Sequence, residues 1–175
     1  MRVNEIKAGQ HGRKKSESDY AGAWTPNINL GLPVLIPETY VRDLPVRLGL
    51  YRRIGALQTE AEIEAMAAEL ADRFGSLPEE VENLLQVVAI KALCRGAGVE
   101  KVDAGPKGVV LSFLKNHFRN PAGLVNWVAA QKGLVKLRPD HKLALLREME
   151  LPQRVRVAKD LLVALVKVAG QAKAA

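Results

Sequence analysis

The stretch that most constrains the fold is Asp43–Glu82, because it carries the clearest helix start and stop signals of the chain. In its centre, apolar residues recur every three or four positions and so share one face of a helix. They are Ile63, Met66, Ala67, Leu70 and Phe74. Thr59 is a suitable N-cap, Glu62 can complete a capping box, and Gly75 can adopt the left-handed conformation that ends a helix. We therefore expect a helix with one buried face between Thr59 and Gly75.

Two more helices are predicted beside this one. Asp43 can cap a helix that runs to about Leu57, since a proline is tolerated in the first turn. Ser76 with Glu79 is predicted to open the following helix by the same capping logic. The first two helices then form a hairpin, and the third follows after a tight corner.

The third helix, predicted over Pro78–Arg95, has apolar residues around much of its circumference, so we expect it to be the most buried helix. Gly96 and Gly98 are expected to end it. Its cysteine, Cys94, is the only one in the chain and cannot form an internal disulfide. Among apolar neighbours, Cys94 is predicted to be a small buried hydrophobe rather than a reactive thiol.

The period of the hydrophobic pattern changes after the third helix. Val99–Ala104 and Val109–Leu114 flank a Gly-Pro-Lys-Gly turn and predict a β-hairpin. Leu134–Arg138 and Leu143–Arg147 flank turn residues and predict a second hairpin. Between the hairpins, Asn120 is a suitable N-cap for a short helix that ends at Gly133.

A last amphipathic helix is predicted over Pro152–Ala169, and Ile28–Ile36 is a short extended segment that suits an edge strand or none. Two hairpins without long crossover connections predict an antiparallel sheet. The expected fold class is therefore α+β: a helical hairpin and further helices packed on a small antiparallel sheet built from two β-hairpins.

Several separate runs of the sequence resemble, in the same order and spacing, the C-terminal domain of the bacterial transcription-repair coupling factors (Mfd). They are INLGLPVLIPETYVRD at Ile28–Asp43, RLGLYRRI at Arg47–Ile54, TEAEIEAM at Thr59–Met66, ELADRFGSLPEEVENLL at Glu69–Leu85 and GVVLSFLKNHFRNPAGLV at Gly108–Val125. The resemblance covers roughly residues 24–170. It implies a regulatory protein-interaction domain that folds against the N-terminal region of an ATP-dependent DNA translocase and masks the surface that binds the excision-repair protein UvrA.

The length of 175 residues suits one domain with a tail. Residues 1–23 are polar and contain the basic cluster Arg13-Lys14-Lys15, so we expect a disordered linker, followed by the domain at 24–170 and a tail at 171–175. Within the resemblance, Val3–Gly9 is similar to the end of a helix of the preceding motor domain. That likeness implies a chain cut from something longer, whether as a fragment or as a naturally short gene product.

The net charge of +7 is unevenly distributed. Residues 43–98 hold six basic and nine acidic residues, whereas residues 99–175 hold fourteen basic and six acidic ones. Lysines spread in this way usually form a solvated face, but a basic half also favours contact with nucleic acid. A free-standing nucleic-acid-binding domain is therefore the alternative function.

No motif for catalysis, cofactor or metal binding is found in the sequence. It lacks the phosphate-binding G-x-x-x-x-G-K-[ST] loop, so we expect neither ATP binding nor ATP hydrolysis by this chain. The three histidines are scattered, and no Cys, His and Asp have metal-ligand spacing. The acids around Glu60–Asp72 are predicted to be a solvated helix face. The N-terminus has no apolar signal-peptide core, so a cytoplasmic, non-enzymatic protein is expected.

Two polar and aromatic groups are candidate interaction surfaces. Arg47, Arg52 and Arg53 flank Tyr51 on the first predicted helix, a combination enriched at protein interfaces. Tyr51 half-buried with the arginines in water is the alternative. The second group, Asn116, His117 and Arg119, precedes the helix capped by Asn120 and suits a binding loop. Here the alternative is that Asn116 and Asn120 only satisfy a turn and a cap.

Overall fold

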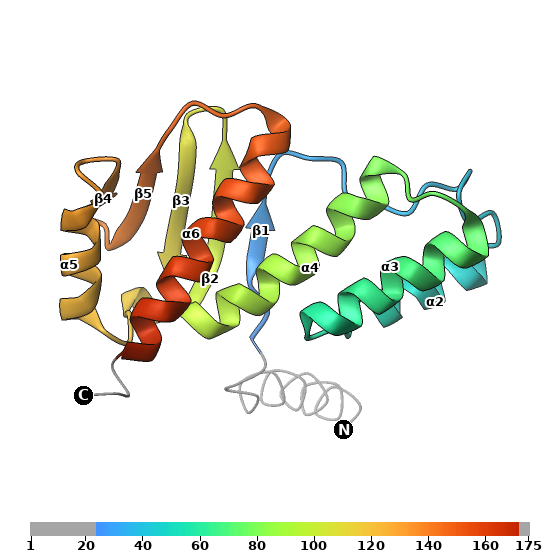
Figure 1. Ribbon diagram of the computed structural model, residues 1–175, viewed down its shortest axis with the longest axis horizontal. Helices are drawn as coiled ribbons and strands as arrows, with labels where there is room; N and C mark the ends of the chain where they lie inside the picture. Colours follow the sequence, from blue (N-terminus) through green and yellow to red (C-terminus); the bar gives the residue numbers. More distant parts are fainter. Residues whose placement is uncertain (1–23, 172–175) are drawn as a thin grey trace, which may run out of the picture.

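The computed structural model describes residues 24–171, so the predicted linker at 1–23 and most of the predicted tail lie outside the described residues. The elements, in chain order, are β1 (Asn27–Asn29), α2 (Leu44–Gly55), α3 (Glu60–Phe74), α4 (Glu79–Ala97), β2 (Val99–Gly105), β3 (Gly108–Phe113), the 3₁₀ turn η1 (Leu114–Asn116), α5 (Pro121–Ala130), β4 (Val135–Leu137), β5 (Lys142–Leu146) and α6 (Leu151–Gln171) (Figure 1). Every predicted helix and both predicted hairpins are present.

The five strands form one sheet in the order β1-β2-β3-β5-β4. All pairs are antiparallel except that of β1 with β2, which is parallel. The α+β class is thus confirmed, and the sheet is mixed because a fifth strand joins the two hairpins. The chain between β1 and β2 passes through α2, α3 and α4, and a connection of this length permits parallel pairing.

Helices cover one face of the sheet: α4 and α6 cross its middle and α5 lies at the β4 side (Figure 1). The side chains that alternate toward these helices are buried completely, among them Val102, Leu111 and Leu143 at 0% exposure. These residues are paired across three adjacent strands, Val102 with Leu111 and Leu111 with Leu143. Alternate residues of these three strands therefore build the wall of the main core.

The buried side chains form two cores, and α4 contributes to both. Val81, Leu85, Val88 and Ala89 of α4 pack with α2, α3 and the segment 36–41, which together we call the helical lobe. Farther along α4, three residues pack with the sheet, α5 and α6, which we call the sheet lobe; they are Ile90, Cys94 and Ala97. The apolar residues around the circumference of this helix are explained by these two cores, and the prediction of a strongly buried helix is confirmed.

The predicted start of α2 is confirmed, because the Asp43 side chain accepts a hydrogen bond from Val46 N. The start of α3 is also confirmed: Thr59 Oγ1 accepts from Glu62 N at 3.1 Å. The capping box differs in detail, because the Glu62 carboxylate accepts from the Thr59 hydroxyl at 3.0 Å rather than from the backbone.

The corner between α3 and α4 differs from the prediction. Gly75 has φ +93° and ψ −171°, a positive-φ extended conformation rather than the left-handed helical one. Ser76 does not cap α4, since Pro78 occupies the N-cap and no side chain caps that end. The fixed φ of Pro78 sets the entry of the chain into the helix and makes a serine cap two residues earlier unnecessary. At the other end, Gly98 closes α4 in the left-handed conformation, while Gly96 remains inside the helix.

Candidate interaction surfaces

Two of the four candidate residues on α2 hold the helical lobe together. The Tyr51 hydroxyl accepts a hydrogen bond from Ile36 N at 2.7 Å, and Arg47 Nη1 donates to Val41 O at 2.8 Å. Both bonds attach α2 to the segment that enters the lobe, where Ile36 and Val41 are buried. Tyr51 is half-buried, as in the alternative interpretation of this group.

Arg53 belongs to an ion-pair network on the surface of the helical lobe. Its Nη1 and Nη2 donate to the two Glu69 carboxylate oxygens at 2.6 and 2.7 Å, and Arg73 Nη1 donates to the same carboxylate at 3.1 Å. The hydrogen bond from Arg53, with a smaller contribution from Arg73, lowers the pKa of Glu69 to about 2. Among the described residues, Arg52 is therefore the one member of the α2 group that is exposed and has no recorded bond.

The second candidate group lies on the loop between β3 and α5. Asn120 caps α5 by accepting from Gly123 N, and its amide also donates to Val168 O of α6 at 2.9 Å. Phe118 is buried and packs edge-on against Phe113, with ring centroids 5.2 Å apart. These two residues anchor the loop, so the role of Asn120 as a cap is confirmed.

Between these anchors the loop projects polar side chains outward. Lys115 and Asn116 both have φ +55°, a conformation that asparagine tolerates better than most residues. His117 and Arg119 are exposed. The loop forms a ridge between two hollows of about 380 and 220 Å³, and His117 lines both of them. The polar side chains of the loop are therefore accessible from both sides of this ridge.

The two predicted groups do not form one surface. The α2 group lies on the helical lobe, whereas the loop lies at the foot of the sheet lobe near the end of α6 (Figure 1). A partner would therefore contact one group or the other, or would span much of the molecule.

A further hollow, which the sequence did not reveal, is a cleft between the lobes. It has a volume of about 810 Å³ and is bounded by α3, α4 and the first turns of α6. Its apolar lining includes the half-buried Ala67 of α3, Val155 of α6 and Leu32, together with the buried Leu85 of α4. We call it the interlobe cleft. It arises because α4 is long enough to carry α3 and α6 on separate halves of its length.

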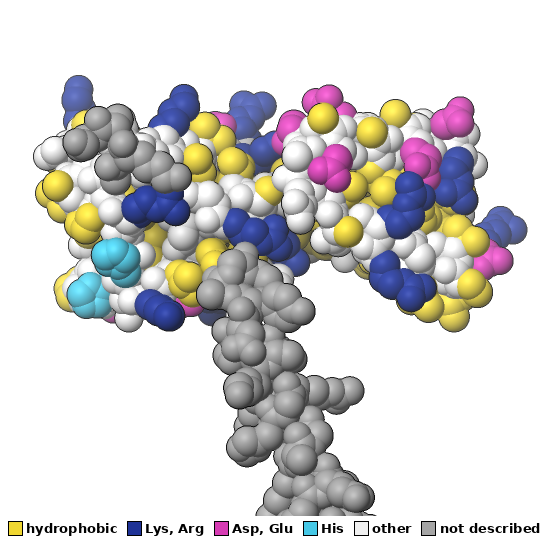
Figure 2. Space-filling model, turned by 90° about the horizontal axis from the view of Figure 1, so that it is seen from below, with side chains coloured by type: hydrophobic (Ala, Val, Ile, Leu, Met, Phe, Trp, Pro, Cys, Tyr) yellow, Lys and Arg dark blue, Asp and Glu magenta, His cyan; other side chains and the backbone are white. Residues whose placement is uncertain are grey.

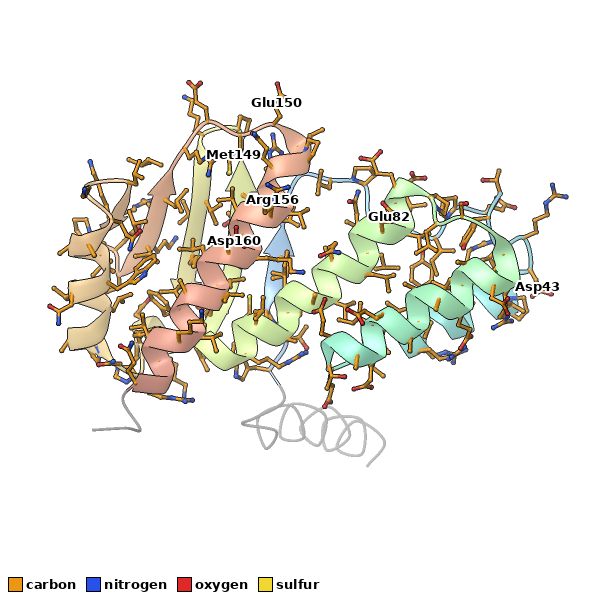
Figure 3. The ribbon with its side chains drawn as sticks, in the orientation of Figure 1. Asp43, Glu82, Met149, Glu150, Arg156 and Asp160 are labelled. Atoms are coloured by element: carbon orange, nitrogen blue, oxygen red, sulfur yellow. The ribbon has the colours of Figure 1, made fainter. Side chains whose placement is uncertain are left out.

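The α3 and α4 sides of the interlobe cleft are acidic, whereas its α6 side carries charges of both signs. Glu60 and Glu64 from α3 and Glu79 and Glu82 from α4 lie on one side. Arg156, Lys159 and Asp160 of α6 lie on the other, and Lys159 Nζ donates to Gln86 Oε1 of α4 at 3.1 Å. Figure 3 shows Glu82, Arg156 and Asp160 on the helices that border the cleft. The acidic residues predicted as a solvated helix face thus form one side of a defined hollow.

The uneven charge of the sequence corresponds to the two lobes. Acidic side chains gather on the helical lobe, whereas the histidines and many basic side chains lie on the sheet lobe (Figure 2). Cys94 lies in the core of the sheet lobe at 0% exposure, and burial raises the pKa of its thiol to about 12. The prediction of a buried, unreactive cysteine agrees with this environment.

Within residues 24–171, no three His, Cys, Asp or Glu side chains are placed to hold a metal ion. None of the described helices is both long and apolar enough to cross a membrane.

The family model of the TRCF domain matches residues 30–124, more than half of the chain. Among curated relatives, the transcription-repair-coupling factor of Rickettsia prowazekii is 42% identical over 127 residues, which are 73% of this chain and 11% of the relative. The transcription-repair-coupling factor of Escherichia coli is 31% identical over 158 residues, 90% of this chain and 13% of the relative. The chain thus spans only a small fraction of the length of these relatives.

The fold has a counterpart among solved structures. The crystal structure of the C-terminal domain of a transcription-repair coupling factor matches with a TM-score of 0.61 and 17% sequence identity, covering 82% of this chain and 96% of that chain. At this identity the match establishes the fold, and it includes nearly all of the compared domain.

Proposed function

This chain belongs to the TRCF domain family, and from that premise we propose that it is the C-terminal regulatory domain of a transcription-repair coupling factor. In this proposal the parent protein is an ATP-dependent DNA translocase that acts on stalled RNA polymerase in transcription-coupled excision repair. The domain itself carries out no chemistry. It folds against the N-terminal region of the parent and masks the surface that binds UvrA.

The observation that carries the proposal is the match to the TRCF domain family. The matched residues 30–124 include the whole helical lobe and the first hairpin, so they contain the acidic side of the interlobe cleft. The sequence has no phosphate-binding loop there. A domain of this kind is suited to protein contacts rather than to nucleotide chemistry.

We place the masking contact at the interlobe cleft. Its glutamates surround a hollow that is partly lined by apolar residues. A basic segment that protrudes from another protein surface would be complementary to this hollow in charge. The exposed residues of the two predicted groups, Arg52, Asn116, His117 and Arg119, form a secondary set of proposed contacts. Arg47, Tyr51 and Arg53 have partners within the helical lobe, so their contribution to masking is indirect.

A masking contact of this type needs little intrinsic affinity. A linker before residue 24 would hold the domain near its target at an effective concentration of about 1 mM, so a weak contact is enough to keep the surface covered. The interface must also open, which favours a polar contact of modest size over a large hydrophobic one. The charged sides of the interlobe cleft meet this requirement.

An experiment in trans tests the proposal. The parent protein lacking this domain is bound to UvrA, and the isolated chain is added at increasing concentration. We expect the chain to displace UvrA only at high concentration, and less well when salt is raised, because the contact is electrostatic. No displacement at any concentration would contradict the proposal. Displacement that is insensitive to salt would remove the electrostatic part of it.

The location of the contact is tested with charge reversals in the intact parent. Glu60→Lys with Glu64→Lys, at the interlobe cleft, should raise UvrA binding because the masking contact is weakened. Arg52→Glu with Arg119→Glu is the matched control at the secondary set and should have a smaller effect. A larger effect of the control pair would move the contact from the cleft to the predicted groups.

A further inference from the structure

The sheet has an outer face that none of the described helices covers. The helices in contact with the sheet, α4, α5 and α6, all pack on the face that carries Val102, Leu111 and Leu143 (Figure 1). Successive side chains of a strand point to opposite faces. The residues next to these three in sequence therefore point to the outer face, away from the core.

A row of cationic residues crosses this outer face. Lys101 of β2 is the partner of Ser112 of β3, which is in turn the partner of Lys142 of β5. Neighbouring strands lie about 4.8 Å apart, so the two lysines begin about 10 Å from each other with the serine between them. Lys136 of β4, opposite Ala144, adds a third ammonium group at the edge.

The charges of this row are only partly compensated. Lys101 is 3.5 Å from the carboxylate of Asp103, a weak ion pair with both side chains substantially exposed. In the described part of the chain, neither Lys136 nor Lys142 has a recorded acidic partner. Ser112, at 8% exposure, is the one buried polar side chain of the described residues. Ser112 therefore lies between the two lysines without presenting a side chain of its own to a ligand.

We propose that this outer face binds the phosphate backbone of duplex DNA without sequence preference. Lysine binds phosphate as a point charge. The proposal goes beyond the masking function and does not depend on it, because masking is assigned to the interlobe cleft, which lies on the other side of the sheet.

The residue types on the outer face favour binding to the backbone of duplex DNA over binding to single strands or to base edges. Outward residues of the described strands include Asn27, Asn29, Lys101, Asp103, Val110, Ser112, Lys136, Lys142, Ala144 and Leu146, and the exposed Glu100 lies beside Lys101 at the bulge of β2. None of these is aromatic, so the face lacks the stacking platform that single strands use. None is an arginine, so the bidentate contact to guanine is missing as well.

Three lysines give weak binding that depends strongly on salt. Each phosphate contact contributes a slope of about −0.9 to the plot of log K against log salt, so the full row predicts a slope between about −2 and −3. Asp103 subtracts from this by competing for Lys101. Such a contact would add to the DNA affinity of the motor domains of the parent protein and would not by itself give tight binding.

Fluorescence anisotropy with a labelled 20-base-pair duplex, at a series of salt concentrations, tests the proposal on the whole chain. The variant Lys136→Gln with Lys142→Gln should lose most of the affinity at low salt, and its slope should become shallower by about 2. The control Arg95→Gln with Lys167→Gln removes the same charge from α4 and α6, which lie on the opposite side of the sheet, and should bind like the parent. Asp103→Asn should bind more tightly, because it releases Lys101.

Three results would overturn the proposal. They are a lack of measurable binding at low salt, equal loss of affinity in the strand and helix variants, and tighter binding to a single strand of the same length. Melting temperatures confirm that each variant is folded. The outcome is separate from that of the UvrA displacement experiment, so failure of one proposal leaves the other standing.

Discussion

At the scale of single residues, Asn120 joins two parts of the sheet lobe that are distant in sequence. Its side-chain oxygen caps α5, and its amide nitrogen donates to Val168 O, 48 residues later. The same side chain explains Gly123, because a Cβ there would lie 2.2 Å from Asn120 Nδ2. A cap signal read from the sequence thus also fixes the position of the last helix.

Two variants of Asn120 separate these roles. Asn120→Ala removes both bonds and should lower the free energy of unfolding by about 1–3 kcal/mol. Asn120→Asp keeps an acceptor for the cap but offers no donor to Val168 O, so it should also destabilise. Urea unfolding of both variants gives the measurement. An aspartate variant as stable as the parent would show that the bond to α6 contributes nothing.

The ion pair of Glu69 predicts a pH dependence of stability. Because Arg53 and Arg73 lower its pKa from 4.5 to about 2, folding favours the ionised carboxylate. The contribution is therefore complete above pH 4.5 and is lost as the pH falls toward 2. It should be small, since the carboxylate is exposed and solvent screens the pair.

Thermal melts of Glu69→Gln against the parent measure this contribution. The difference in melting temperature should be largest at pH 6 and much smaller near pH 2.5, because the contribution falls as the pH approaches the folded-state pKa of about 2. Glu64→Gln, on the same helix and without a recorded ion pair among the described residues, is the control and should show little difference at either pH. A Glu69 difference that persists unchanged at pH 2.5 would contradict the ion-pair account.

At the scale of elements, α4 is the helix on which the others depend. Leu85 is 4% exposed in the core of the helical lobe, so Leu85→Ala should lower the free energy of unfolding by about 2–5 kcal/mol. Leu48→Ala, at an exposed position of α2 in the same lobe, should be nearly neutral. Denaturant midpoints of the two variants provide the comparison. Coincident midpoints for Leu85→Ala and the parent would contradict the assigned core.

Helix caps could be predicted from the sequence, whereas the pairing of distant strands could not. Asp43, Thr59 and Asn120 were predicted as caps because a cap depends on residues within one turn, and all three are confirmed. The parallel pairing of β1 was beyond prediction, because three residues carry little pattern and their partner strand lies some 70 residues later. Ser76 failed as a cap because a proline already determined the entry to α4.

The candidate surfaces were also predictable only in part, because the sequence shows local signals but not contacts between distant segments. The loop at Asn116–Arg119 could be read from a strand followed by a cap, both of which are local signals. The interlobe cleft could not, since its lining comes from α3, α4 and α6 and depends on where each packs along α4. The bonds that hold Arg47 and Tyr51 were equally hidden, because their partners lie on a segment without regular structure.

At the scale of the whole molecule, the two lobes share one continuous helix and should unfold together. Trp127 packs against the core of the sheet lobe, so in a Trp24→Phe background its fluorescence reports that lobe, whereas far-UV circular dichroism reports helices of both lobes. We expect the two signals to give coincident urea transitions, because melting either core removes the packing of α4. An earlier transition by circular dichroism would show that the helical lobe unfolds alone.

The same architecture separates the two proposed activities. The interlobe cleft carries acidic residues and is assigned to masking, and the outer face of the sheet carries lysines and is assigned to DNA. One domain can therefore release its partner surface without leaving the nucleic acid. The uneven charge of the sequence would then serve both activities, with the glutamates at the masking contact and the lysines at the DNA contact.

Titration of UvrA against the intact parent protein and against the parent lacking this domain tests masking most directly. We predict that the truncated protein binds UvrA more tightly, because the covering domain no longer competes for the surface. A parent that keeps the domain but carries Glu60→Lys and Glu64→Lys should lie between the two. Equal UvrA affinity of the intact and truncated proteins would contradict the account.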